Sequence, residues 1–234
     1  MSKKLRNWIT VLFILLMLTI YASFIFFRDK IAVPKVQYLG IVLCLLFTFA
    51  IFENRKDAWF LRAALFFTVI SDWFLVIKQS DYLLALITFT IAQFFYAIRL
   101  WENDGSVNRN KKHILMRSMV LIIMELGFLF LFKILKIKYD SLIFMGVMYF
   151  TFLLMNVLLA FMQLRKNILF PIGMTLFLCC DVLVGLSNLQ NYIALAEPSF
   201  LLAIINSPVD LIWIFYFPSQ ALLALSILTN RKKL

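Results

Sequence analysis

The chain has 234 residues, of which 64% are hydrophobic and 15% are charged, and its formal net charge is +11. Because a soluble domain has roughly 45–50% apolar residues, this composition excludes an ordinary soluble protein and predicts an all-α integral membrane protein. The whole chain has only six glycines, which excludes a glycine-rich phosphate-binding loop and a dinucleotide-binding fold.

Hydrophobic runs recur along the chain, and a helix of about 20 apolar residues is needed to cross ~30 Å of hydrocarbon. We predict about eight spans, at residues 8–27, 36–52, 59–77, 82–101, 114–132, 142–162, 169–189 and 209–229. The first run follows a basic segment, but its length and the lack of a small-residue cleavage site favour a retained span over a signal peptide. Residues 1–234 are therefore expected to form one transmembrane bundle without a soluble domain.

The positive charges are unevenly distributed between the links. Lys and Arg gather at both termini and in the links that lie on the same side as the termini. By the positive-inside rule this places both termini in the cytoplasm, and we expect a bacterial cytoplasmic membrane. The charge also favours contact with anionic lipid headgroups. Since no basic, aromatic-bearing soluble fold is present, nucleic acid is not an expected partner.

Three acidic residues lie alone inside predicted spans: Asp72 in the third, Glu125 in the fifth and Asp181 in the seventh. A charge in hydrocarbon is costly, so an intramembrane acid indicates a functional site by default. The third and seventh spans enter from the same side, which places Asp72 and Asp181 at an equal depth of ~18–20 Å. We favour function for these two because Asn would supply a helix–helix hydrogen bond more cheaply. For Glu125 the structural and functional interpretations remain balanced.

The span after each aspartate carries an amide and a tyrosine on one helix face. These residues are Gln93 with Tyr96, and Tyr216 with Gln220, spaced three or four residues apart. The order of acid-bearing helix, short link and amide-bearing helix thus occurs twice. It predicts a parallel four-plus-four repeat of the bundle.

Other polar and small residues favour close helix packing. Tyr149, Asn156 and Gln163 form a stripe on the sixth span, and we interpret the two amides as hydrogen-bonding across helices. Gly173 and Gly185 flank the second intramembrane aspartate on its own face. Glycines at such positions predict the close approach of another helix.

Cysteine and histidine offer no metal site. Cys44, Cys179 and Cys180 fall inside spans without metal-ligand spacing, and His113, the single histidine, lies at the edge of a polar link. This argues against a zinc site, a histidine-centred triad and any metal or other cofactor.

Two carboxyl groups close together in a low-dielectric interior do not both ionise readily, so one stays protonated while the other is anionic. Such a pair suits general acid and general base catalysis on one substrate, including chemistry that passes through an oxocarbenium ion. The same pair also suits a proton or cation relay in a transporter. The residues alone leave both alternatives open.

Four stretches resemble a known family: Ile70-Ser71-Asp72-Trp73-Phe74-Leu75, Phe89 to Tyr96, Leu176 to Asp181, and Tyr216 to Gln220. In these stretches and in their order the chain resembles the YhhN-like, lysoplasmalogenase family of multi-pass membrane proteins. The resemblance implies hydrolysis of the vinyl-ether bond of lysoplasmalogens, with a membrane lipid as substrate and no cofactor. The products are a fatty aldehyde and a glycerophospho-base.

On this hypothesis Asp72 and Asp181 form the catalytic pair. The residues that orient substrate and water are Gln93, Tyr96, Tyr216 and Gln220, and Lys35 meets the lipid headgroup. The family's fourth-span motif usually has histidine where this chain has Gln93. This departure leaves open a catalytically inactive relative that acts through other contacts.

Overall fold

The computed structural model describes residues 1–27, 32–103, 111–136, 140–189, 192, 202, 207 and 210–229. All regular structure in these residues is helical, as the composition predicts. The elements are α1 (Lys3–Phe26), α2 (Val33–Ala50), α3 (Lys56–Asp72), the π-helix η2 (Trp73–Lys78), α4 (Tyr82–Asn103), α5 (Lys111–Ile134), α6 (Ser141–Met162), α7 (Leu169–Leu189), α9 (Leu211–Leu225) and the 3₁₀-helix η4 (Ser226–Leu228).

Seven helical stretches among the described residues are long and apolar enough to cross a membrane. They are α1, α2, α3 with η2, α4, α6, α7 and α9 with η4. The fifth predicted span forms a long helix, α5, but is not one of these seven, and it carries Arg117, Glu125 and Lys133. The all-helical membrane bundle is therefore confirmed, while a crossing by α5 stays a prediction.

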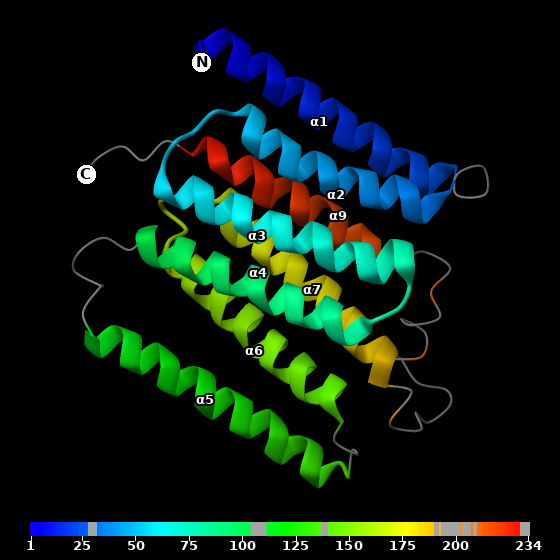
Figure 1. Cartoon of the computed structure of the whole chain (residues 1–234), viewed down its shortest axis with the longest axis vertical. Coiled ribbons are helices and arrows are strands. Elements are labelled where there is room, and N and C mark those ends of the chain that lie inside the picture. The colour runs from blue at the N-terminus through cyan, green and yellow to red at the C-terminus, as the bar shows by residue number, and fades with distance from the viewer. Residues whose placement is uncertain are drawn as a thin grey trace.

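Six helices form a closed ring, because α2, α3, α4, α6, α7 and α9 each pack against the next and α9 packs against α2. The other two lie outside this ring at opposite edges of the bundle, α1 against α2 and α5 against α6 (Figure 1). Each neighbour relation in the first four helices recurs in the last four. These are the relations expected of a parallel four-plus-four repeat.

Successive helices run in opposite directions, so α1 begins and α9 ends at the same end of the bundle, on the left of Figure 1. We call this end the N-terminal face and the other end the opposite face. The assignment of the N-terminal face to the cytoplasm rests on the charge distribution alone.

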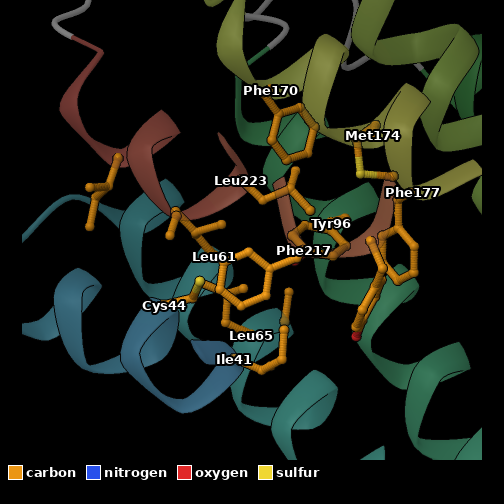
Figure 2. Close-up of a cluster of buried hydrophobic side chains, with 14 of the residues drawn as sticks. Ile41, Cys44, Leu61, Leu65, Tyr96, Phe170, Met174, Phe177, Phe217 and Leu223 are labelled. Atoms are coloured by element: carbon orange, nitrogen blue, oxygen red, sulfur yellow. The ribbon is translucent and has the colours of Figure 1, made fainter. Parts of the chain in front are cut away.

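The interior of the ring is a cluster of buried apolar side chains. Figure 2 shows its centre, where side chains from α2 and α3 meet those of α7 and α9 around Tyr96 of α4. By contrast, α1 and α5 expose many large apolar side chains, such as Trp8, Leu12, Ile123 and Phe130. Exposed apolar faces on long helices are expected where the surrounding solvent is lipid.

Gly173 and Gly185 differ in their surroundings. A Cβ added at Gly173 would lie 3.0 Å from Leu223 and 3.1 Å from the Ser219 carbonyl oxygen, so α9 does approach α7 closely there. Among the described residues, no atom lies within 4 Å of a Cβ added at Gly185, so no described helix makes the predicted close approach there. The reason is that Gly185 lies near the end of α7, beyond the closest contact with α9.

Candidate functional site

Asp72 and Asp181 lie in the half of the bundle nearer the opposite face. At about 1.5 Å per residue, Asp72 is about 9 Å from the end of η2 and Asp181 about 12 Å from the end of α7. Asp72 is the last residue of α3, and the π-helix η2 follows it directly. A π-helical turn is rare and occurs frequently at functional sites.

Each aspartate accepts a hydrogen bond from a tyrosine. The Tyr216 hydroxyl of α9 donates to Oδ2 of Asp72 at 2.6 Å. The Tyr149 hydroxyl of α6 donates to Oδ2 of Asp181. The first of these bonds joins the two halves of the chain, because α3 belongs to one half and α9 to the other.

Aromatic rings connect the two aspartate–tyrosine pairs. Phe89 lies 5.6 Å from Tyr149 and 5.8 Å from Phe177, and Phe177 lies 5.4 Å from Tyr216, measured between ring centroids. Such offset and edge contacts are favourable and hold the rings in fixed orientations. The two pairs therefore share one aromatic wall.

The two carboxyl groups differ in accessibility. Asp181 is near enough to Asp72 to act on it electrostatically. Asp72 is 2% exposed, whereas Asp181 is only partly buried. The structure thus brings the two predicted catalytic residues together, with Asp181 as the more accessible one.

Gln93 and Gln220 are fully buried and lie deeper in the bundle. Gln93 Oε1 accepts a hydrogen bond from Asn156 Nδ2 at 3.0 Å, and Gln220 Nε2 donates to Ser219 Oγ at 3.3 Å. Gln93 Nε2 and Gln220 Oε1 have no hydrogen-bond partner among the described atoms. One unused donor and one unused acceptor thus remain in the interior. An unsatisfied buried polar group costs about 1–3 kcal/mol. The unused donor and the unused acceptor therefore favour the binding of a polar ligand or water.

The structure places the other two predicted site residues farther from the aspartates. Tyr96 lies about one helical turn beyond Gln93, in the apolar cluster of Figure 2, close to Thr68 but with its hydroxyl outside good hydrogen-bond geometry. Lys35 is exposed at the start of α2, at the opposite face. It is at the rim of the bundle, one turn before Tyr38, whose ring contacts Trp73.

The sequence places Tyr149 in the polar stripe of α6, but its contact with Asp181 was not predicted. Equal depth in the bundle could have indicated this contact, because both residues lie about 12 Å from the opposite face on adjacent antiparallel helices. Glu125, in contrast, accepts a hydrogen bond from Thr151 Oγ1 at 3.2 Å at the α5–α6 contact, outside the site.

No three His, Cys, Asp or Glu side chains gather as a metal site within the described part of the chain. The side chain of His113 lies outside the described residues. The candidate site therefore consists of carboxyl, phenol and amide groups, which transfer protons and form hydrogen bonds. These groups suit acid–base chemistry on a guest molecule.

Comparison with known protein families identifies a relationship for this chain. The sequence model of the YhhN family matches residues 36–227, a range that runs from α2 to η4 and includes both aspartates. No curated protein and no solved structure matches the chain significantly.

Proposed function

The chain belongs to the YhhN family, and we propose on this basis that it hydrolyses the vinyl-ether bond of lysoplasmalogen-type lipids inside the membrane. The observation that supports this most is the pairing of two intramembrane carboxyl groups within electrostatic range, each held by a tyrosine. Burying two carboxyl groups costs much free energy if they only join helices, whereas carboxyl groups transfer protons effectively.

The reaction needs one acid and one base. The protonated carboxyl group transfers its proton to the vinyl carbon that is not bonded to oxygen, which leaves an oxocarbenium ion. The ionised carboxyl group removes a proton from water as the water oxygen bonds to the cationic carbon. The resulting hemiacetal then breaks its bond to the glycerol oxygen. The carboxyl group that took the water proton gives it to that oxygen, and the other carboxylate takes the proton of the hemiacetal hydroxyl as the aldehyde forms, which restores the pair. The products are a fatty aldehyde and a glycerophospho-base, and one water is consumed.

The surrounding residues hold the reacting groups. Tyr216 and Tyr149 fix the orientation of the two carboxyl groups through their hydroxyl hydrogen bonds. The unused donor of Gln93 and the unused acceptor of Gln220 are available to water and to the substrate's polar atoms. The aromatic wall of Phe89 and Phe177 packs against the hydrocarbon chain of the lipid. We place Lys35 at the rim, where it meets the phosphate when the headgroup lies at the opposite face.

The experiment is aldehyde release by the purified protein with a vinyl-ether lysolipid. We expect Asp72→Asn and Asp181→Asn each to lower turnover by ~10²–10⁴-fold, which is the usual contribution of a general acid or base. Glu125→Gln is the matched control, since it neutralises an intramembrane acid outside the site, and it should retain activity. Near-normal turnover in either folded Asn variant would rule out the proposed pair.

A further inference from the structure

Three unpaired polar atoms lie in the interior of the ring, on the N-terminal side of the two aspartates. They are Nε2 of Gln93, the hydroxyl oxygen of Tyr96 and Oε1 of Gln220, and we call them the polar centre. The three side chains are 0% exposed, and none of these atoms has a hydrogen-bond partner among the described atoms. Since roughly 90% or more of buried polar groups bond to protein or to ordered water, three such atoms together indicate a bound ligand.

The three atoms lie at a similar depth. Both α4 and α9 run from the opposite face to the N-terminal face, and helical side chains lean toward the start of their helix. The side chains of Gln93, Tyr96 and Gln220 therefore point toward the level of the aspartates. At about 1.5 Å per residue, the Cα atoms of the two glutamines lie about 15 and 12 Å from the N-terminal face. The Cα atom of Tyr96 is nearer that face, but its longer side chain brings the hydroxyl close to Thr68, about 18 Å from it.

The polar centre lies next to Asp72. Gln220 is one helical turn from Tyr216 on the same face of α9, and the Tyr216 hydroxyl donates to Asp72 at 2.6 Å. Thr68 is one turn before Asp72 on α3, and Asp72 is near enough to Tyr96 to act on it electrostatically. A ligand at the polar centre therefore lies within about one helical turn of this carboxyl group.

The surroundings of Asp181 are different. The residue one turn before Asp181 on α7 is Phe177, where α3 has Thr68 before Asp72. Phe177 is 0% exposed and belongs to the aromatic wall with Phe89. Polar atoms thus adjoin Asp72, and apolar rings adjoin Asp181. The hydrocarbon chain of a lipid suits the second environment, and a small polar ligand suits the first.

Water is the ligand that fits the polar centre. The ligand must accept a hydrogen bond from Gln93 and donate one to Gln220, and water does both. Phosphate oxygens only accept, an ammonium only donates, and a hydrocarbon chain does neither. Figure 2 shows Phe170 and Leu223 packed beside Tyr96, so apolar side chains close the N-terminal side of the polar centre. Buried water typically makes about three hydrogen bonds to otherwise unpaired polar groups, which suits these three atoms.

We propose that Gln93, Tyr96 and Gln220 bind water in the interior of the ring, and that this site supplies the water consumed in the reaction. The second part rests on the proposed hydrolysis, whereas the first part does not. Lipid and water then reach the carboxyl pair from different sides, the lipid along the aromatic wall beside Asp181 and the water from the polar centre beside Asp72. Water held in this way is positioned before the lipid binds, which lowers the entropic cost of bringing two reactants together.

X-ray radiolysis of the purified full chain in isotopically labelled water tests the site without any catalysis. Radiolysis turns a bound water into a hydroxyl radical, which oxidises the side chains beside it. We expect labelled oxygen on Tyr96, although its side chain is fully buried. Phe47 is the matched control, because it is a buried aromatic residue that stacks on Phe13 of α1, away from the polar centre. No label on Tyr96, or an equal yield on Phe47, would overturn the proposal.

Gln220→Met removes an amide and keeps the length of the side chain. It should lower the label on Tyr96 about twofold or more, because one of about three hydrogen bonds to the water is lost. Gln163→Met should leave the label unchanged, since Gln163 is a buried glutamine at the end of α6 that donates to the Leu100 carbonyl oxygen at 2.8 Å. Gln93→Met is the second variant if Gln220→Met does not fold. An unchanged label in the folded variant would overturn the role of the glutamines.

Turnover of the same variants tests the supply of water. With a vinyl-ether lysolipid, Gln220→Met should lower kcat about tenfold while KM stays within about twofold, because the lipid does not contact the polar centre. Gln163→Met should keep the wild-type kcat. An unchanged kcat in a Gln220→Met protein that has lost the label would overturn the supply role. No aldehyde from the wild type would overturn the proposed hydrolysis and the supply role together, and the radiolysis result would decide the water site alone.

Discussion

At the residue scale, the main feature is a carboxyl group held by a phenol inside the membrane. Asp72 is 2% exposed and accepts the Tyr216 hydroxyl at 2.6 Å. A hydrogen bond to a charged group is worth about 1.5–3 kcal/mol, and the fixed direction of the Oδ2 lone pair orients the group for proton transfer. The tyrosines therefore act as positioning residues for the aspartates.

Replacing Tyr216 with Phe removes this hydroxyl and keeps the ring in the aromatic wall. We expect Tyr216→Phe to lower turnover about tenfold or more, because Asp72 loses its only side-chain hydrogen bond among the described contacts. Tyr38→Phe is the control, since Tyr38 also lies beside this site through Trp73 but makes no hydrogen bond to the aspartates in the described part of the chain. Aldehyde release measures both, and equal activities of the two variants would show that the Tyr216 hydroxyl has no positioning role.

The sequence predicted the two aspartates of the candidate site but not the surroundings of its other polar residues. A charge inside a hydrophobic run is energetically costly, so the positions of Asp72 and Asp181 within such runs marked them as candidates from the sequence alone. The spacing of Gln93 and Tyr96 predicted a shared face but not which neighbours that face meets. Tyr96 consequently lies in the apolar cluster rather than beside the carboxyl groups. The π-helix after Asp72 has no side-chain signature and was not predicted.

At the element scale, α9 contains a proline whose missing N–H is compensated by another helix. Pro218 cannot donate to the carbonyl oxygen of Ile214, four residues earlier. The Tyr21 hydroxyl of α1 donates to that oxygen at 3.2 Å. This bond attaches α1 to the ring and supplies a donor to a part-buried carbonyl group whose usual helical donor the proline removes.

A double-mutant cycle tests this compensation. Tyr21→Phe should lower the free energy of unfolding by about 0.5–1.5 kcal/mol in the wild-type background. In a Pro218→Ala background the restored N–H bonds to Ile214, so the same substitution should cost clearly less. The measurement is unfolding by denaturant in detergent, and an identical cost in both backgrounds would argue against the role of Tyr21.

The contact between α2 and α9 depends on a glycine. A Cβ added at Gly40 would lie 2.2 Å from the ring of Phe217, which is itself buried. Gly40→Ala should therefore destabilise the protein by about 1–3 kcal/mol, the usual cost of overpacking. Gly127→Ala on α5 is the matched control, because no atom of the described residues lies within 4 Å of its added Cβ. Thermal unfolding of the two variants should differ, and equal unfolding temperatures would contradict the close contact.

At the scale of the whole molecule, a ring of six helices encloses the site and the two outer helices cover opposite edges (Figure 1). The hydrophobic runs and their lengths predicted the bundle, and the repeated order of acid-bearing and amide-bearing spans predicted a four-plus-four repeat, which stays a prediction. They could not predict helix contacts, because a lipid-facing and a protein-facing apolar residue look alike in sequence.

Hydrolysis of a vinyl ether by this ring is tested most directly by the substrate selectivity of the wild-type protein. Purified protein is supplied with a vinyl-ether lysolipid and, in parallel, with the matching saturated-ether lysolipid, and aldehyde is measured. Because protonation of the double bond starts the reaction, we expect aldehyde from the vinyl ether and none from the saturated ether. No aldehyde from either lipid with folded protein would contradict the proposed hydrolysis and favour lipid or proton transport, which sealed vesicles would measure.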